Sequence, residues 1–178
     1  ERIKMKAYLL YFNSGVKNMK EISITTQFKV FDSNLDLPND IQELMTHAVE
    51  VRKNAYAPYS KFRVGVAILL DNGEIVLGSN QENAAYPSGL CAERVAVFYA
   101  GAVYPEAKIL KMAITAASDT NQTMAPIPPC GSCRQSIAEY EIKQETPIEI
   151  YFMGEIGAIY KSESLKNLLP FMFDKKFL

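Results

Sequence analysis

The cysteines are the feature that most constrains what this chain can fold into and do. Three occur among 178 residues, Cys91, Cys130 and Cys133, and the last two form a C-x-x-C pair. An odd number cannot all enter disulfides, and this spacing is typical of metal or redox chemistry in a reducing compartment. The only histidine, His47, lies far from them in the sequence, and a Cys-His or Ser-His mechanism would have to recruit it. A zinc site in this chain must therefore be rich in thiolates.

Loops lead into predicted helices at both cysteine positions. Cys91 follows the loop PSGL, Cys130 follows PIPP, and the apolar spacing predicts helices over 91–100 and 130–140. The free N–H groups and the dipole at a helix N-terminus stabilise negative charge, which lowers a thiol pKa and favours the thiolate. Because Cys130 and Cys133 are three residues apart in a first helical turn, both can face one ion.

Three protein ligands would leave tetrahedral zinc one open position, which distinguishes catalytic sites from closed structural ones. Glu93 lies two residues after Cys91, so its carboxyl can lie beside the open coordination position without binding the metal. A general acid and base needs such a place next to the reacting group. Arg94 lies three residues after Cys91, on the same helix face. We hypothesise that its guanidinium donates to the sulfurs and offsets the negative charge of three thiolates. A redox pair or half of a structural zinc site remains the alternative for an isolated C-x-x-C.

The remaining patterns alternate between helix and strand, which predicts an α/β layered fold. We expect one three-layer domain over 21–178, with a mixed five-stranded sheet flanked by helices, and we interpret residues 1–20 as an extension outside the catalytic core. His47 is off the apolar stripe of its helix and should be a surface residue. The predicted elements are an edge strand within 21–30, a helix from Asn39 or Asp40, a hairpin of 64–70 and 74–77 around Asp71-Asn72-Gly73, strands at 111–116, 148–152 and 158–160, and a short helix at 164–169.

Charge and hydropathy exclude several classes of partner. Lys and Arg number 19 against 20 Asp and Glu, for a formal net charge of -1, whereas a nucleic-acid binder usually carries a basic excess or stripe. No apolar run approaches the roughly 20 residues of a membrane-spanning helix. We therefore expect no nucleic-acid polymer and no membrane as partner, and a cytoplasmic location.

Four motifs together make the chain resemble the cytidine deaminase family, in its three-cysteine, homotetrameric branch. They are PYSKFRVG at 58–65, GSNQENAAYP at 78–87, CAER at 91–94 and PCGSCRQ at 129–135. The last two match the C-x-E and P-C-x-x-C signature of zinc nucleobase deaminases. The resemblance runs from about residue 41 to 173.

The resemblance implies one Zn²⁺ per subunit, held by Cys91, Cys130 and Cys133, with Glu93 as the proton shuttle. Seven further positions match substrate-binding residues of the family. They are Asn80 and Glu82 at the ribose 3′-hydroxyl, Ala84 and Tyr86 near the 5′-hydroxyl, Ala92 with a backbone N–H for the pyrimidine carbonyl, Phe62 flanking the base, and Phe173 as the C-terminal aromatic that reaches a neighbouring subunit's site. Judged alone, Phe62 and Phe173 would be ordinary core residues.

The implied activity is hydrolytic deamination of cytidine or deoxycytidine, with release of ammonia, in pyrimidine salvage. The nearest alternative is a deaminase of another aminopyrimidine nucleoside, such as blasticidin S, although Asn80 with Glu82 favours a plain ribose. A polynucleotide deaminase is a further alternative, and it would need a basic groove with aromatic platforms. The balanced charge argues against it.

Overall fold

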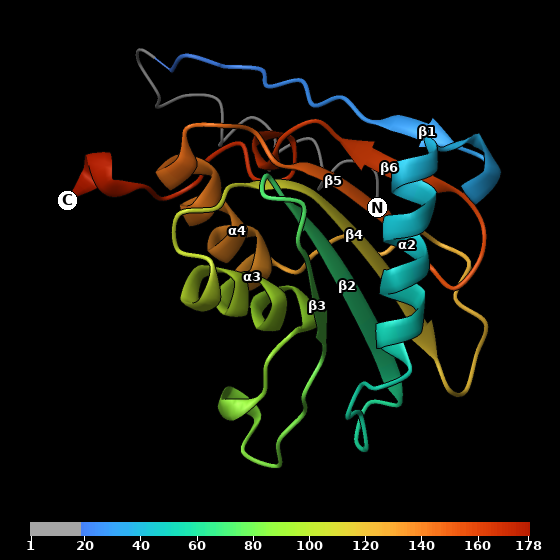
Figure 1. Ribbon diagram of the computed structural model, residues 1–178. Helices are drawn as coiled ribbons and strands as arrows, with labels where there is room; N and C mark the ends of the chain where they lie inside the picture. Colours follow the sequence, from blue (N-terminus) through green and yellow to red (C-terminus); the bar gives the residue numbers. More distant parts are fainter. Residues whose placement is uncertain (1–18) are drawn as a thin grey trace, which may run out of the picture.

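The computed structural model describes residues 19–178 and shows a three-layer α/β arrangement (Figure 1). In this part of the chain a mixed six-stranded sheet has the order β1-β6-β5-β4-β2-β3. The strands are β1 (Lys29–Phe31), β2 (Phe62–Leu70), β3 (Ile75–Ser79), β4 (Ile109–Ser118), β5 (Glu149–Met153) and β6 (Ile159–Ser162). The helices are α2 (Asn39–Arg52), α3 (Ala92–Val103) and α4 (Gly131–Gln144), with short 3-10 turns at Asn34–Asp36, Tyr86–Ser88, Leu165–Asn167 and Lys175–Phe177.

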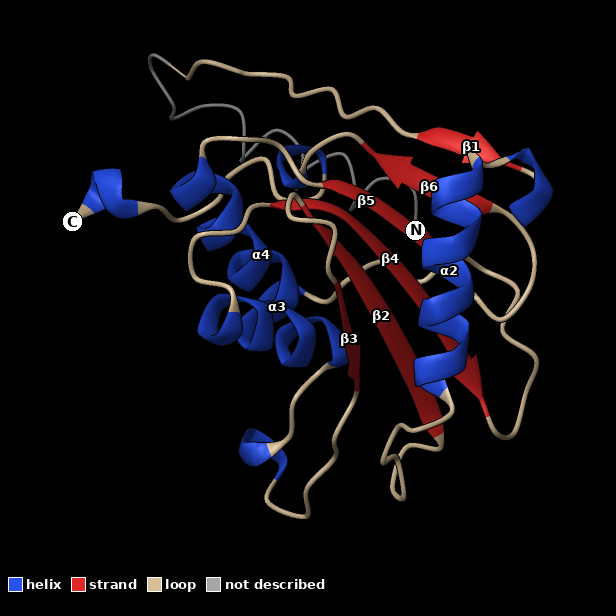
Figure 2. Ribbon diagram, viewed as in Figure 1, coloured by secondary structure: helices blue, strands red, loops and turns tan. Residues whose placement is uncertain are grey.

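Helices cover both faces of the sheet, as the predicted three layers require (Figure 2). Side chains alternate along β2: Val66 and Ile68 belong to the core shared with α3 and α4, whereas Ala67 belongs to the core under α2. The apolar stripe of α2 is buried as its spacing predicts, through Ile41, Leu44, Met45 and Ala48. β4 and β5 are parallel, and the other neighbouring strands are antiparallel.

Two glycines let the helices lie close to the sheet. A Cβ on Gly65 of β2 would lie 2.1 Å from the carbonyl oxygen of Ala48 in α2. A Cβ on Gly78 of β3 would lie 2.5 Å from the carbonyl oxygen of Ala92, the first residue of α3. The absence of a side chain at Gly78 therefore lets the start of α3, next to Cys91, pack directly on the sheet.

The sheet has six strands, so the prediction of five was wrong by one. The edge strand expected within 21–30 forms only at the end of that segment, as β1 at Lys29–Phe31, and it pairs with β6, which is only four residues long. Phe28 anchors this segment edge-on against Phe152, with ring centroids 6.3 Å apart. The alternating apolar and polar residues of 21–30 favour a strand, but only the residues that lie opposite β6 have a neighbouring backbone with which to form hydrogen bonds.

Three further expectations concern the periphery of the fold. His47 is partly exposed on α2, and the predicted helix at 164–169 is a 3-10 turn at Leu165–Asn167. Of the predicted extension 1–20, residues 1–18 lie outside the described part of the chain, and Met19 and Lys20 are exposed. Within residues 19–178, no helix has the length and apolar content to cross a membrane.

Candidate active site

The three cysteines meet where α3 and α4 begin side by side on one face of the sheet (Figure 2). Cys91 is the N-cap of α3 and Cys130 the N-cap of α4, both with extended backbone, and Cys133 is buried in the first turn of α4. The Sγ atoms of Cys91 and Cys130 are 3.9 Å apart, those of Cys130 and Cys133 3.5 Å apart, and all three lie within 4.8 Å of one another. Tetrahedral zinc with Zn–S bonds of about 2.3 Å separates its sulfurs by about 3.8 Å. The cluster therefore fits zinc, with one coordination position left open.

Arg94 contacts the thiol cluster. Its Nη2 donates to the Sγ of Cys91 at 3.8 Å, while its buried Nε has no hydrogen-bond partner among the described residues. The hydrogen bond from Cys133 and that from Arg94 lower the pKa of Cys91 to about 5. A guanidinium at this distance favours the thiolate, the form that binds a metal.

Glu93 is almost fully buried beside the cluster, with 5% of its surface exposed. Burial raises the pKa of its carboxyl above the ordinary range, and the adjacent Cys91 sulfur raises it further. A raised pKa favours the protonated carboxyl, which can exchange its proton with a reacting group.

A cavity of about 460 Å³ opens next to Cys91, a volume in the range of small-molecule sites. Of the residues matched to substrate binding, Glu82 and Tyr86 line this cavity, together with Cys91 and Arg94. The remaining lining residues are Tyr59, Ser60, Gln81, Asn83, Gly89 and Leu90.

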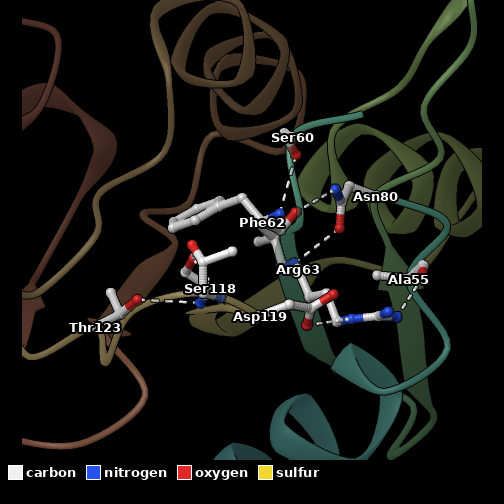
Figure 3. Close-up of polar contacts among 10 residues, drawn as sticks. Ala55, Ser60, Phe62, Arg63, Asn80, Ser118, Asp119 and Thr123 are labelled. Atoms are coloured by element: carbon white, nitrogen blue, oxygen red, sulfur yellow. Dashed lines mark hydrogen bonds and ion pairs between the residues drawn. The ribbon is translucent and has the colours of Figure 1, made fainter. Parts of the chain in front are cut away.

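Asn80 and Glu82 also bind the backbone of the segment 59–64, which includes the first residues of β2. The Nδ2 of Asn80 donates to the carbonyl of Phe62 at 2.9 Å, and its Oδ1 accepts from the N–H of Val64 at 2.8 Å (Figure 3). The Oε2 of Glu82 accepts from the N–H groups of Tyr59 and Ser60 at 2.9 and 3.2 Å. Hydrogen bonds from Ser60 and Tyr59 lower the pKa of Glu82, which keeps it ionised. The sequence motifs did not indicate these contacts.

The other matched positions are more scattered. Ala84 is exposed, and Tyr86 is 79% exposed with its ring edge-on to Tyr59 at 6.4 Å. Ala92 is buried at the first position of α3, where helical N–H groups lack an intrahelical partner. Phe173 is 57% exposed, stacks on Phe177, and does not line the cavity within this described chain.

Sequence reasoning missed Arg63, which joins three segments near Phe62. Its Nε donates to Asp119 and its Nη1 to the carbonyl of Ala55, both at 2.8 Å (Figure 3). Arg63 lies within the PYSKFRVG motif, but Asp119 is 56 residues further along the chain. No local pattern indicates such a pairing.

Comparison with known proteins agrees with this geometry. Residues 38–146 match the family model for the cytidine and deoxycytidylate deaminase zinc-binding region. The cytidine deaminase of Halalkalibacterium halodurans is 38% identical over 134 residues, or 75% of this chain and 94% of that protein. That of Sporosarcina psychrophila is 39% identical over 139 residues, or 78% and 95%.

Solved structures lead to the same family. The crystal structure of cytidine deaminase from Burkholderia pseudomallei is 33% identical and superposes with a TM-score of 0.64, covering 77% of this chain and 100% of that chain. The matched region 38–146 contains Glu93 and all three cysteines. With its fold, its zinc-spaced thiols and these similarities, the chain belongs to the cytidine and deoxycytidylate deaminase family.

Proposed function

We propose that this protein is a zinc-dependent hydrolase that deaminates cytidine, deoxycytidine or both to the corresponding uridine, with release of ammonia. The observation that carries the proposal is the juxtaposition of three thiols at zinc spacing with the buried Glu93, where one of the thiols, Cys91, lines a cavity of about 460 Å³. The similarity to cytidine deaminases over three quarters of the chain supports the choice of substrate.

Cys91, Cys130 and Cys133 would hold the metal. Bound there, zinc supplies Lewis acidity that brings the pKa of water to about 7. Glu93 takes one proton from the attacking water and delivers it to N3 of the pyrimidine. It then takes the second proton from the new C4 hydroxyl and delivers it to the departing amine. In the net reaction a C–O bond forms at C4, the C4–N bond breaks, and ammonia leaves.

The remaining side chains would bind and orient the nucleoside. Asn80 and Glu82 contact the 3′-hydroxyl, since each keeps hydrogen-bonding capacity beyond its backbone contacts. The other proposed roles are the backbone N–H of Ala92 at the pyrimidine carbonyl, Phe62 against the base, Ala84 and Tyr86 near the 5′-hydroxyl, and Phe173 in a neighbouring subunit's site. This last role supports a homotetramer, which rests on the family resemblance.

We further propose that residues 21–178 form one catalytic domain that acts in pyrimidine salvage in the cytoplasm. One continuous sheet from β1 to β3 supports the single domain. Three free thiols within metal-binding distance suit a reducing compartment.

Replacing Arg94 with Gln should weaken zinc retention about 10- to 100-fold, the usual cost of losing a group that supports a metal ligand. The reason is the lost donation to the Cys91 sulfur, which favours the thiolate. Competition with a chromogenic chelator measures the affinity. Arg134→Gln is the matched control, because Arg134 follows Cys133 but donates to backbone carbonyls at Pro129 and Leu168. Equal zinc affinity in wild type and Arg94→Gln would remove Arg94 from this role.

A substrate panel tests the proposed activity. Absorbance-monitored deamination of cytidine, deoxycytidine, cytidine monophosphate and blasticidin S is measured with zinc quantified in the same sample. We expect turnover of cytidine, deoxycytidine or both. Zinc-loaded protein that leaves both unchanged would overturn the proposal, and turnover of blasticidin S alone would favour the alternative nucleoside.

A further inference from the structure

The backbone is strained directly before Phe62. Lys61 has a φ of +56°, in the left-handed region that residues other than glycine adopt at an energetic cost. Such a conformation persists only where the surroundings hold it in place. The contacts that hold the segment 59–64 therefore determine where the Phe62 side chain lies.

The side chain of Asn80 provides two of these contacts, in addition to the hydrogen bond from its backbone N–H to the carbonyl of Val64. β3 ends at Ser79, so from this point β2 has no regular strand on that side. The side-chain amide of Asn80 takes the place of the next strand residue, because it donates to the carbonyl of Phe62 and accepts from the N–H of Val64 (Figure 3). The two partners also define the orientation of the amide, since a carbonyl needs a donor and an N–H needs an acceptor.

Glu82, Ser60 and β4 hold the rest of the segment, and Glu82 accepts from the N–H groups of Tyr59 and Ser60. The hydroxyl of Ser60 accepts from the N–H of Phe62 at 3.0 Å, and Phe62 is in register with Ser118 of β4 on its other side. Asn80 is thus the side chain that binds the peptide groups on the β3 side of Phe62. Without it, the carbonyl of Phe62 and the N–H of Val64 would both lose a partner.

We propose that Asn80 is a positioning residue that sets the orientation of Phe62, beyond any contact it makes with the sugar. This inference rests on the proposed function, because it matters for turnover only if Phe62 packs on the pyrimidine. An amide offers two donor hydrogens and two acceptor lone pairs, and β2 uses one of each. The second N–H is not used by β2 and remains for a sugar hydroxyl, so one side chain would link recognition of the sugar to placement of the aromatic ring.

A substrate lacking the 3′-hydroxyl separates the two roles. We expect Asn80→Ala to lower kcat/KM at least tenfold for 3′-deoxycytidine, which has no hydroxyl for the amide to bind. In a Phe62→Leu background the same change should cost less than threefold, because the ring it positions is gone. Loss with cytidine only would show that Asn80 acts on the sugar alone. Equal losses on 3′-deoxycytidine in both backgrounds would show that Asn80 does not act through Phe62, and either result would overturn the proposal.

A fluorescence readout makes the test independent of activity and of one variant's folding. The chain has ten tyrosines and no tryptophan, so Phe62→Trp introduces a single tryptophan at this position, which is excited selectively at wavelengths longer than the tyrosines absorb. Asn80→Ala should shift the emission of this tryptophan to the red and lower its anisotropy, because both side-chain contacts to β2 are lost. Asn80→Asp replaces it if the alanine variant does not fold. Asp keeps the acceptor for the N–H of Val64 but loses the donor to the carbonyl of Phe62, so the same shifts are expected. Unchanged emission and anisotropy in a folded variant would overturn the positioning role.

Two controls complete the design. Asn72→Ala removes a comparable side chain-to-backbone bond, the one to the N–H of Glu74 in the β2–β3 turn, and should change kcat/KM less than twofold. Wild-type protein that carries zinc but deaminates neither cytidine nor deoxycytidine would refute the proposed function, while the fluorescence comparison would still decide whether Asn80 orients position 62.

Discussion

Replacing Glu93 with Gln is expected to reduce kcat at least a thousandfold while zinc stays at one ion per chain. Glutamine has the same shape and fits the same buried position, but it cannot take up and release a proton, and losing a positioned acid and base typically costs 10² to 10⁴ in rate. The nearly complete burial of Glu93 leaves little room for bulk water to replace it as the proton carrier. Turnover is measured with cytidine, and zinc by elemental analysis of the same sample.

Glu141 offers a matched control, because it is another buried carboxylate on the same side of the sheet. It accepts from the N–H groups of Ile148 and Leu165 and from the hydroxyl of Ser164, away from the cysteines. Glu141→Gln should lower the melting temperature and leave kcat within a fewfold of wild type. Glu93→Gln with near wild-type turnover would exclude Glu93 from the proton transfer.

Replacing Cys133 with Ser should abolish both zinc binding and activity. Cys133 is fully buried between Cys130 and Cys91, and a serine hydroxyl does not deprotonate to bind zinc as a thiolate does. A metal present at a thousandfold excess over its Kd stabilises the folded state by about 4 kcal/mol. For a chain of this size that corresponds to a fall in melting temperature of about 8–16 °C.

Chelator-treated wild type is the control for this variant. It should melt near the temperature of Cys133→Ser, and adding Zn²⁺ should restore stability and turnover to the wild type only. If Cys133→Ser retained stoichiometric zinc and its melting temperature, Cys133 would not be a ligand, and the metal site would have to be built from other donors.

Much of the fold follows from short-range patterns. The stripe at Ile41, Leu44, Met45 and Ala48 predicts α2, and Asp71-Asn72-Gly73 predicts the turn between β2 and β3, because helices and tight turns depend on neighbours a few residues away. β1 was predicted less accurately, since its extent depends on β6 and on the contact of Phe28 with Phe152. A strand forms only where another strand pairs with it, and local sequence patterns do not indicate which strand that is.

The site divides in the same way. The sequence by itself determined that Cys130 and Cys133 share a helical turn, that Cys91 opens another helix, and that Glu93 follows it. Only the tertiary structure decided that the two helix starts meet with Sγ atoms of Cys91 and Cys130 3.9 Å apart, and that the amide of Asn80 binds the backbone around Phe62. The physical reason is the range of the interactions. Residue spacing controls which side chains share a helical turn, whereas the packing of helices on the sheet, which Gly78 permits for α3, controls which turns and strands meet.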